Sequence, residues 1–347
     1  MGTDIKAGIH TVTIAGGPLA FPCGKDDTIL SGGLRAGIGL PHECLSGGCG
    51  KCYFDLAGGA VEDIWLEAKG LSPRARERGR RLACQSRPLG DCTIKLRPDP
   101  ALAPPIRPAR RPARLVSRRM LAPGMAEFAF AAEGAARFLP GQFALLQLPG
   151  VAGRRAYSMS NLANEDGRWE FVVRRVPGGA GTGRLFEMEE GAAVELDGPY
   201  GNAYLRTDTG RDIICIAGGS GLSPIISIAR AAVADDELLE HRRITVFYGG
   251  RGPDDLCTTT FWQENRRLHT HAECHVAISD PTAAGAADWT GHRGFIHEIV
   301  QKVLASADMP NFDYYLCGPA PMVEALVELL ETGASVPRGQ IHYDSFF

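Results

Sequence analysis

The sequence predicts a multidomain chain: a cysteine-rich N-terminal domain, an antiparallel β-barrel and a parallel-sheet α/β domain. Three observations indicate this order. Three of the ten cysteines lie within residues 44–52, and six prolines lie within residues 98–112. Near residue 208, short strands separated by turns give way to apolar strands that alternate with helices. We therefore expect domains at 1–97, 113–207 and 208–347, with a linker at 98–112.

The overall composition excludes several classes of protein. The 347 residues carry 37 Lys and Arg against 40 Asp and Glu, so the chain as a whole is not a basic nucleic-acid-binding protein. Its apolar runs are shorter than the 18 residues of a membrane span. The N-terminus MGTDIKAGIHTV lacks the basic and apolar regions of a signal peptide. We expect a cytoplasmic monomer with reduced thiols, bound neither to nucleic acid nor to a membrane.

The first 97 residues read as a small mixed domain. HTVTIAG (10–16) alternates like a strand, and Gly16–Pro18 form a turn. Residues 27–37 predict a short helix with Asp27 as its N-cap. Residues 51–63 indicate strand, turn and strand, and 91–98 a closing strand.

Proline dominates residues 98–112 and argues against an interior strand or a helix there. A semi-extended linker is the first interpretation. The same region is basic, with Arg107, Arg110 and Arg111, and Arg114, Arg118 and Arg119 just beyond. These residues are either solvated linker side chains or a surface for an acidic protein partner.

The remainder of the chain changes from one β pattern to another. Strand candidates at 113–121, 126–132, 142–149, 169–176 and 192–199 are separated by Gly, Pro and Asn, as in an antiparallel barrel. Four apolar strands then follow, at 212–219, 244–250, 274–279 and 312–319. Helical segments between and after them, at 223–241, 258–267, 295–305 and 321–332, predict a parallel sheet covered on both faces.

The cysteine motif has the spacing of a plant-type [2Fe–2S] site. PHECLSGGCGKC gives Cys44-x4-Cys49-x2-Cys52, and RLACQSRP supplies Cys84 as the fourth ligand. Glycines at 47, 48 and 50 let the backbone approach the cluster and offer amides to its sulfurs. Zinc is the rival metal, but the second half of the motif has no paired cysteines. A C-x2-C redox pair would leave Cys44 and Cys84 without roles.

A short strand and a glycine loop suit a flavin. In RAYSMSN (155–161), Arg155 can pair with a pyrophosphate, Tyr157 can pack on a ring and Ser158 can hydrogen-bond a ring nitrogen. An ordinary strand with a half-buried Tyr157 is the alternative. Gly178, Gly179 and Gly181 precede Thr182 at a helix-like start, which suits phosphate oxygens.

Two glycine turns suit a dinucleotide. IAGGSGLSP (216–224) lacks the full G-x-G-x-x-G pattern, but it still joins a strand to a helix through Gly218, Gly219 and Gly221. LCGPAPM (316–322) makes a second such turn. Both turns lie at the carboxyl ends of parallel strands, where ligands bind in open α/β sheets.

Together these motifs resemble the ferredoxin–NAD(P) reductase superfamily. The order of a ferredoxin-like domain, RAYS, GGSG and CGP is similar to the reductase components of bacterial multicomponent aromatic oxygenases. IAGGSG, ITVFYG, YLCGP and the ending IHYDSFF resemble the reductases of toluene-type diiron monooxygenases. GNAYLR and PAPMVEAL resemble those of Rieske dioxygenases, so both kinds of partner oxygenase stay open.

The resemblance implies a β-grasp ferredoxin domain, an FAD-binding barrel and an NAD(P)H-binding domain. It implies that Ser158 lies near flavin N5, that Cys317 lies near the nicotinamide and that the terminal Phe346–Phe347 pair places a ring against the flavin. The cofactor-binding residues that it implies are Gln142, Arg155, Ala156, Tyr157, Ser158, Val173, Arg174, Gly181, Thr182, Gly218, Gly219, Ser220, Gly221, Pro224, Gly249, Arg251, Cys317, Gly318, Pro319 and Phe347.

The sequence favours NADH over NADPH. In YGGRGPDDL (248–256), Arg251 stands alone and is followed by Asp254 and Asp255. A carboxylate at this position suits free ribose hydroxyls, whereas a 2′-phosphate needs a basic cluster. Arg251 is the residue that keeps NADPH open.

The three cofactors imply an electron relay from NADH through FAD to the [2Fe–2S] cluster, because FAD exchanges electrons both in pairs and singly. The electron acceptor would be the oxygenase component or an intermediary ferredoxin. A stand-alone flavin reductase and a sugar-deoxygenation reductase built from the same modules are alternatives. A pure electron carrier with an inactive nucleotide domain is a third, and the intact GGSG and CGP turns count against it.

Overall fold

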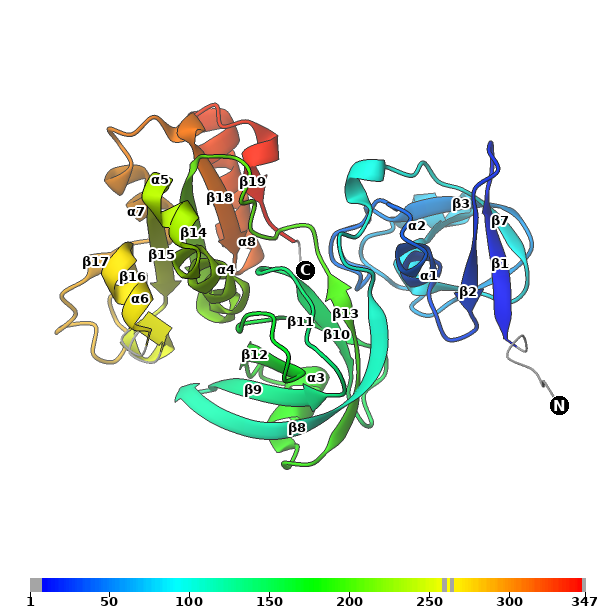
Figure 1. The fold of residues 1–347 in the computed structure, drawn as a ribbon, viewed down its shortest axis with the longest axis horizontal. Coiled ribbons are helices and arrows are strands. Elements are labelled where there is room, and N and C mark those ends of the chain that lie inside the picture. Colours follow the sequence, from blue (N-terminus) through cyan, green and yellow to red (C-terminus); the bar gives the residue numbers. More distant parts are fainter. Residues whose placement is uncertain (1–7, 258–260, 263–264, 345–347) are drawn as a thin grey trace. The chain divides into compact units, whose positions relative to one another are not determined.

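The computed structural model describes residues 8–257, 261–262 and 265–344. They form two compact units, of which the first contains the chain up to Arg110 together with Asp197–Tyr200. The second contains Arg111–Leu196 and Gly201–Asp344. Figure 1 shows the order of the elements along the chain.

The N-terminal unit is a β-grasp domain. Its main sheet has the order β2-β1-β7-β3-β5, in which β1 and β7 are parallel and the other neighbours are antiparallel. Helix α1 packs its apolar side chains into this domain, and β4 and β6 pair separately. The bounds are β1 Ile9–Ile14, β2 Ala20–Gly24, α1 Ile29–Arg35, β3 Tyr53–Gly58, β4 Val61–Asp63, α2 Pro73–Glu77, β5 Arg80–Leu82, β6 Ser86–Pro88 and β7 Cys92–Lys95.

The cap of α1 differs from the sequence prediction. The N-cap is Thr28, whose hydroxyl accepts a hydrogen bond from the Ser31 amide, and not Asp27. Asp27 instead binds two arginines, Arg35 at 3.0 Å and Arg110 at 2.5 Å. Asp27 thus pairs with arginines, one of which is distant in the sequence, and a local sequence pattern does not reveal such a partner.

The prediction of a strand-free linker over 98–112 is wrong for its last four residues. Strand β8 (Ala109–Ala122) begins inside this range, after the short 3-10 helix η2 (Pro100–Leu102). Pro112 fits because the pairing of β8 with β9 (Met125–Ala132) begins only at Ala113, so this ladder needs no amide from the proline.

The arginines around the linker are engaged within the chain. Arg110 binds Asp27, and Arg119 binds Glu127 at 3.1 Å. Backbone carbonyls accept hydrogen bonds from Arg111, Arg114 and Arg118, and Arg107 lies against Gly37. Of these six arginines, Arg110 and Arg119 bind carboxylates, while Arg107, Arg114 and Arg118 remain exposed, so a basic surface for an acidic partner stays a prediction.

The following strands form a six-stranded sheet of order β11-β10-β13-β8-β9-β12. The edge strands approach each other through a bridge between Met159 and Phe171, which curls the sheet into a barrel. Its core is aromatic, with the Phe130 and Phe171 rings 6.0 Å apart. The additional bounds are β10 Phe143–Gln147, β11 Arg155–Ser158, β12 Arg168–Arg174, α3 Ala180–Glu187 and β13 Ala193–Tyr200.

The C-terminal part is a parallel sheet of order β17-β16-β15-β14-β18-β19. Alternate residues of β14 pack into different cores: Ile213, Cys215 and Ala217 face α4, while Ile214 and Ile216 join the core of α7 and α8. Helices therefore cover both faces, as the continuous apolar strands predicted. The bounds are β14 Asp212–Gly218, α4 Leu222–Ala234, α5 Asp236–His241, β15 Ile244–Gly250, α6 Arg266–His271, β16 Ala272–Ile278, β17 His292–Arg293, α7 Ile296–Val303, β18 Phe312–Cys317, α8 Ala320–Glu328 and β19 Ile341–His342.

Two helix predictions need correction. The single helix expected over 223–241 is split at Asp235, whose carboxylate accepts a hydrogen bond from the Leu238 amide and caps α5. The helix expected over 258–267 falls partly on residues 258–260 and 263–264, which lie outside the described residues, and α6 begins at Arg266. None of the helices in the described residues is long and apolar enough to cross a membrane.

A buried carboxylate joins separate parts of the parallel-sheet domain. Asp313 on β18 is fully buried, and its Oδ1 accepts hydrogen bonds from Arg211 at 2.9 and 3.0 Å. Its Oδ2 accepts from Thr209 and lies 3.3 Å from the buried Arg242. Burial works to raise the pKa of Asp313, but the neighbouring His342, Thr209 and Arg211 outweigh it and hold the pKa below its usual value.

We expect Asp313→Asn to lower the Tm of the protein by roughly 6–12 °C, which corresponds to ~3 kcal/mol, because it leaves Arg242 buried without its counter-ion. Because the folded-state pKa is depressed, the Asp313 contribution is present above the unfolded-state pKa of about 3.9 and is lost as pH falls below it. Thermal melting followed by circular dichroism at several pH values measures both effects.

The matched control is Asp236→Asn, which removes an ion pair with Arg267 whose two side chains are 83% and 47% exposed. Its cost should stay below about 1 kcal/mol. Equal melting temperatures for the two variants would contradict the role assigned to Asp313.

Candidate functional site

The cysteine motif lies in a long loop between α1 and β3, and its fourth member follows β5. Cys44, Cys52 and Cys84 are buried, and Cys49 is partly exposed. The side chains meet as two pairs: Cys44 with Cys49 and Cys52 with Cys84, each pair within hydrogen-bonding reach. The structure therefore brings all four predicted ligands together in one place.

Amide groups surround these sulfurs. The Ser46 and Cys49 amides each donate to Cys44 Sγ at 3.4 Å, and Gln85 Nε2 donates to Cys84 Sγ at 3.7 Å. The hydrogen bond from the Cys49 thiol is the main cause that lowers the pKa of Cys44 to about 4, while burial acts to raise this pKa. The pKa of Cys52 is lowered as well, whereas the pKa values of Cys49 and Cys84 are raised, because one thiol of each pair donates its hydrogen to the other.

Glycines let the loop fold tightly around the cysteines. Gly50 has a φ of +74° and faces Gly70 so closely that a side chain at Gly50 would lie 2.3 Å from the Gly70 carbonyl oxygen. The Gly70 amide donates to the Gly47 carbonyl at 2.9 Å. Gly70 is a structural residue of the site that the sequence motif did not single out.

The paired arrangement fits a two-iron cluster. In such a cluster each iron takes two cysteines, whereas a structural zinc ion needs four ligands that converge on one point. The pairs Cys44–Cys49 and Cys52–Cys84 match the donor set of a two-iron cluster.

The RAYS strand is the edge strand β11 of the barrel, paired with β10. Arg155 bends over the preceding loop and donates to the Ala152 carbonyl at 3.0 Å. A side chain at Gly181 would lie 2.9 Å from Arg155 Cγ, so only glycine lets α3 begin against this arginine. A hollow of about 560 Å³ adjoins α3, between Ala180, Gly183 and Arg184 and the loop Pro149–Val151. Arg184 and Glu187 contribute one charge of each sign to this hollow, and Arg155 does not line it.

Tyr157 and Ser158 lie half-buried at the end of β11. Burial raises the pKa of Tyr157 to about 12, so the phenol stays neutral. The Ser158 carbonyl accepts a hydrogen bond of 2.6 Å from Ser223, while the Ser158 hydroxyl has no partner within the described ranges. That hydroxyl is therefore available to a ligand.

A polar stripe on α4 holds the edges of the barrel against the nucleotide domain. Ser223 Oγ also accepts from the Val172 amide at 3.0 Å, so one hydroxyl connects β11, β12 and α4. Ser227 and Arg230 donate to the carbonyls of Asn161 and Ser160 at 2.7 and 3.0 Å. Sequence reasoning missed these residues, although polar side chains at i, i+4 and i+7 on an apolar helix are a readable signal.

The two glycine turns pack against each other at the carboxyl ends of β14 and β18. Ala217 lies opposite Cys317 in the parallel ladder. A side chain at Gly221 would lie 2.1 Å from the Cys317 carbonyl oxygen, and one at Gly318 would lie 3.1 Å from the Gly218 amide nitrogen. Pro224 is buried in the helix that follows, and Ser220 and Pro319 reach the surface. The two predicted dinucleotide turns thus lie next to each other at this end of the sheet.

An ion pair connects the two predicted cofactor regions. Arg174 of β12 binds Asp255 Oδ1 at 2.8 Å, next to Gly219. The other Asp255 oxygen accepts from the amides of Arg251 and Gly252. Asp255 is thus fully engaged within the protein, and of the two acidic residues after β15 only Asp254 is exposed to a ribose.

Other predicted site residues have partners within the protein. Gln142 is buried, with Oε1 accepting from the Leu139 amide and Nε2 donating to Gly201, so its side chain supports the loop and does not face a ligand. The Thr182 hydroxyl accepts from the Val176 amide. Gly249 lies against Ile296, Ala156 lies within β11, and Val173 is in the barrel core. Phe346 and Phe347 lie outside the described residues.

Three family models match consecutive parts of the chain. They are the 2Fe-2S iron-sulfur cluster binding domain at residues 12–89, the oxidoreductase FAD-binding domain at 112–204 and the oxidoreductase NAD-binding domain at 215–328. They follow the order of the β-grasp domain, the barrel and the parallel sheet described above.

Similar proteins span nearly the whole chain. The ferredoxin–NAD(P)+ reductase CarAd of Metapseudomonas resinovorans is 42% identical, covering 94% of this chain and 96% of its own. The ferredoxin–NAD+ reductase component of the alkene monooxygenase system of Xanthobacter autotrophicus is 38% identical, covering 94% and 98%. A solved structure, the ferredoxin reductase in carbazole 1,9a-dioxygenase, is 38% identical with a TM-score of 0.88 and covers 98% of both chains.

We expect Cys49→Ser to remove the iron–sulfur absorption and EPR signals but to leave NADH oxidation by a small two-electron dye. The reason is that Cys49 belongs to the N-terminal unit, while the nucleotide turns belong to the second unit. Cys23→Ser is the control, because Cys23 is a buried thiol of the same domain that faces the Thr28 carbonyl instead of the cluster loop. Loss of dye reduction together with the cluster would disprove this separation.

We expect Ser223→Ala to destabilise the second unit by about 1–3 kcal/mol and to weaken FAD retention, because it strips the Val172 amide and the Ser158 carbonyl of a shared partner. Thermal melting with and without added FAD, and flavin released on gel filtration, measure the two effects. Ser117→Ala is the control, since that barrel serine makes no side-chain hydrogen bond to any described residue. Unchanged FAD retention would refute the positioning role.

Proposed function

This chain belongs to the ferredoxin–NAD(P)+ reductase family that joins a [2Fe–2S], an FAD-binding and an NAD-binding domain, and we propose that it delivers electrons from NADH to an oxygenase system. The acceptor would be the oxygenase component itself or an intermediary ferredoxin. The observation that carries this proposal is that one chain holds two pairs of cysteines, two adjoining glycine turns and a helix after the first turn that binds the RAYS strand through Ser223.

The proposal assigns each of these residue groups a task. When bound, FAD accepts electrons in pairs from the nicotinamide and releases them singly to the [2Fe–2S] cluster. Cys44, Cys49, Cys52 and Cys84 hold the irons. Arg155 and the N-terminus of α3 bind the flavin pyrophosphate, while Tyr157 packs against the ring and the Ser158 hydroxyl orients it.

No side chain needs to act as a general acid or base. Burial raises the pKa of Cys317 to about 12, so it remains a neutral thiol at neutral pH. Its half-buried position at the end of β18 suits a group that packs against the nicotinamide and excludes water from it.

Acidic groups around Arg251 support NADH as the electron donor. Asp254 is exposed beside it, Asp255 binds its amide, and the Asp280 amide donates to its carbonyl at 2.8 Å. A 2′-phosphate brought to Arg251 would meet the exposed Asp254 carboxylate, whereas free ribose hydroxyls can donate to it.

We also propose where the protein works and in which oligomeric state. The ten cysteines are free thiols, which suits the reducing cytoplasm. We further propose a monomer that works without nucleic acid and without attachment to a membrane.

The test is an anaerobic titration of the purified holoprotein with NADH, followed by addition of an acidic [2Fe–2S] ferredoxin or of free FMN. We expect flavin bleaching, a reduced-cluster EPR signal and then reduction of the ferredoxin faster than of FMN. A chain that reduces only FMN would be a stand-alone flavin reductase. If NADH does not bleach the bound flavin, the chain would be an electron carrier with an inactive nucleotide domain.

We expect Cys317→Ser to slow flavin reduction by NADH about tenfold, which corresponds to ~1.4 kcal/mol of barrier, while leaving FAD bound. A more polar, more strongly hydrated hydroxyl would disturb the packing against the nicotinamide. Stopped-flow absorbance measures the rate. Cys274→Ser is the control, because Cys274 lies on β16, which β15 and β14 separate from the strand of Cys317. An unchanged rate would show that Cys317 does not contact the nicotinamide.

A further inference from the structure

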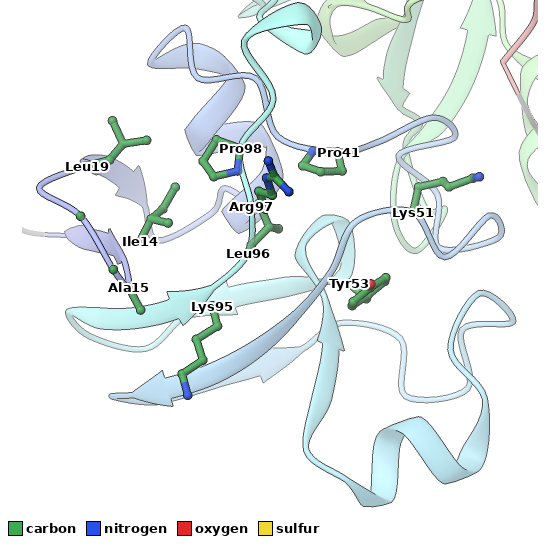
Figure 2. A pocket seen from close by; sticks show the side chains of 12 residues that line it. Ile14, Ala15, Leu19, Pro41, Lys51, Tyr53, Lys95, Leu96, Arg97 and Pro98 are labelled. Carbon is green, nitrogen blue, oxygen red and sulfur yellow. The ribbon is translucent and has the colours of Figure 1, made fainter. Parts of the chain in front are cut away.

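A groove of about 670 Å³ opens on the β-grasp domain (Figure 2). Three stretches line it: the β1–β2 turn with Ile14 and Leu19, the end of β7 with Lys95–Pro98, and the start of β3 with Tyr53. Pro41 and Lys51 from the cysteine loop complete its wall. Its volume lies within the ~300–1,000 Å³ of ordinary ligand sites, so it can accept several side chains of a partner.

The groove combines an apolar lining with a cationic rim. Leu19 is 38% and Tyr53 is 49% exposed, and both line this one groove. The charged residues of the lining are Lys51, Lys95 and Arg97, and the lining contains no carboxylate. Arg80 adds a fourth cation, 4.7 Å above the Tyr53 ring.

These cations are weakly neutralised. Among the described residues, no carboxylate lies within ion-pair distance of Lys95 or Arg97, and Lys51 has only Glu43 at 3.8 Å with its own side chain 59% exposed. Asp55 faces Lys95 across the β3–β7 ladder, but its ion pair is with Arg80 at 3.6 Å. With Arg80, the rim therefore carries four cations against the carboxylates of Glu43 and Asp55, a net positive charge.

The charge of the whole domain has the same sign. Residues 1–97 contain 13 Lys and Arg against 10 Asp and Glu, a net charge of +3, whereas the full chain carries −3. The positive charge thus belongs to the domain that holds the cysteine loop. Such an asymmetry steers an acidic protein toward this domain and away from the remainder.

The groove also lies beside the predicted cluster. Lys51 is placed between the ligands Cys49 and Cys52, and Pro41 lies three residues before Cys44. Because electron transfer between proteins slows steeply with distance, an acceptor must approach the cluster through a surface next to this loop.

We propose that this groove docks an acidic, partly apolar segment of the protein that accepts electrons from the cluster. The inference rests on the proposed function and deepens it by naming the surface and the chemistry of the partner. Leu19 and Tyr53 receive apolar side chains of the acceptor, and Lys51, Lys95 and Arg97 bind its carboxylates.

The experiment uses the full-length holoprotein, with an acidic [2Fe–2S] ferredoxin as the probe. Lys95→Glu/Arg97→Glu reverses two charges of the groove without touching a cluster ligand. Arg74→Glu/Arg78→Glu makes the same change of net charge at exposed positions in and after α2 that do not line the groove. Steady-state reduction of the ferredoxin by NADH is followed at 20 and 200 mM salt.

For the groove variant we expect a KM for ferredoxin at least tenfold higher at low salt, an unchanged kcat and a flatter salt dependence. The control variant should change KM less than threefold. Reduction of an uncharged quinone by NADH and the reduced-cluster EPR signal should match the wild type in both.

Three results would overturn the proposal. Equal KM values for the two variants would show that only net charge matters, and a normal KM for the groove variant would place the ferredoxin elsewhere. A concentration-dependent dimer in sedimentation velocity that the groove variant loses would assign the groove to a second copy of the chain. A wild-type protein that forms the reduced-cluster signal but does not reduce ferredoxin would instead contradict the proposed function.

Discussion

The hydroxyl of Ser223 is the contact on which the second unit depends. It accepts from the Val172 amide and donates to the Ser158 carbonyl, so a single buried oxygen joins two barrel edges to the first turn of α4. Strand β11 carries the RAYS residues predicted to bind the flavin, and α4 follows the GGSG turn predicted to bind the nicotinamide cofactor. The Ser223 hydroxyl thereby holds these two elements together. A polar bond fits here because a buried backbone amide and carbonyl at a sheet edge must find partners.

Local patterns in the sequence were sufficient for most of the fold. The strands of the barrel and of the parallel sheet were found from their alternation and apolar runs, because those patterns follow from burial on one face or on both. The errors came from interactions across long sequence separations. Thr28 caps α1 while Asp27 binds Arg110, 83 residues away, and Asp235 splits a helix that periodicity alone would continue.

The candidate site was predictable where the motif itself fixes the geometry, and less so elsewhere. Cys44, Cys49 and Cys52 lie close together because their spacing serves one loop, and Cys84 joins them from the turn after β5. Gln142 was expected at a ligand, yet its amide supports the backbone around Gly201. Side-chain direction decides that difference, and no sequence spacing records it. The stripe of Ser223, Ser227 and Arg230 was readable in principle, but its partners are backbone carbonyls of another domain.

The ion pair between Arg174 and Asp255 has a consequence for the evolution of coenzyme choice. Asp255 serves the loop after β15 with one oxygen and the barrel strand β12 with the other. Replacing it to admit a phosphorylated coenzyme would also leave an arginine beside the flavin region without its counter-ion. Because the proposed coenzyme loop and the barrel strand share Asp255, a substitution of this residue disturbs both of them together.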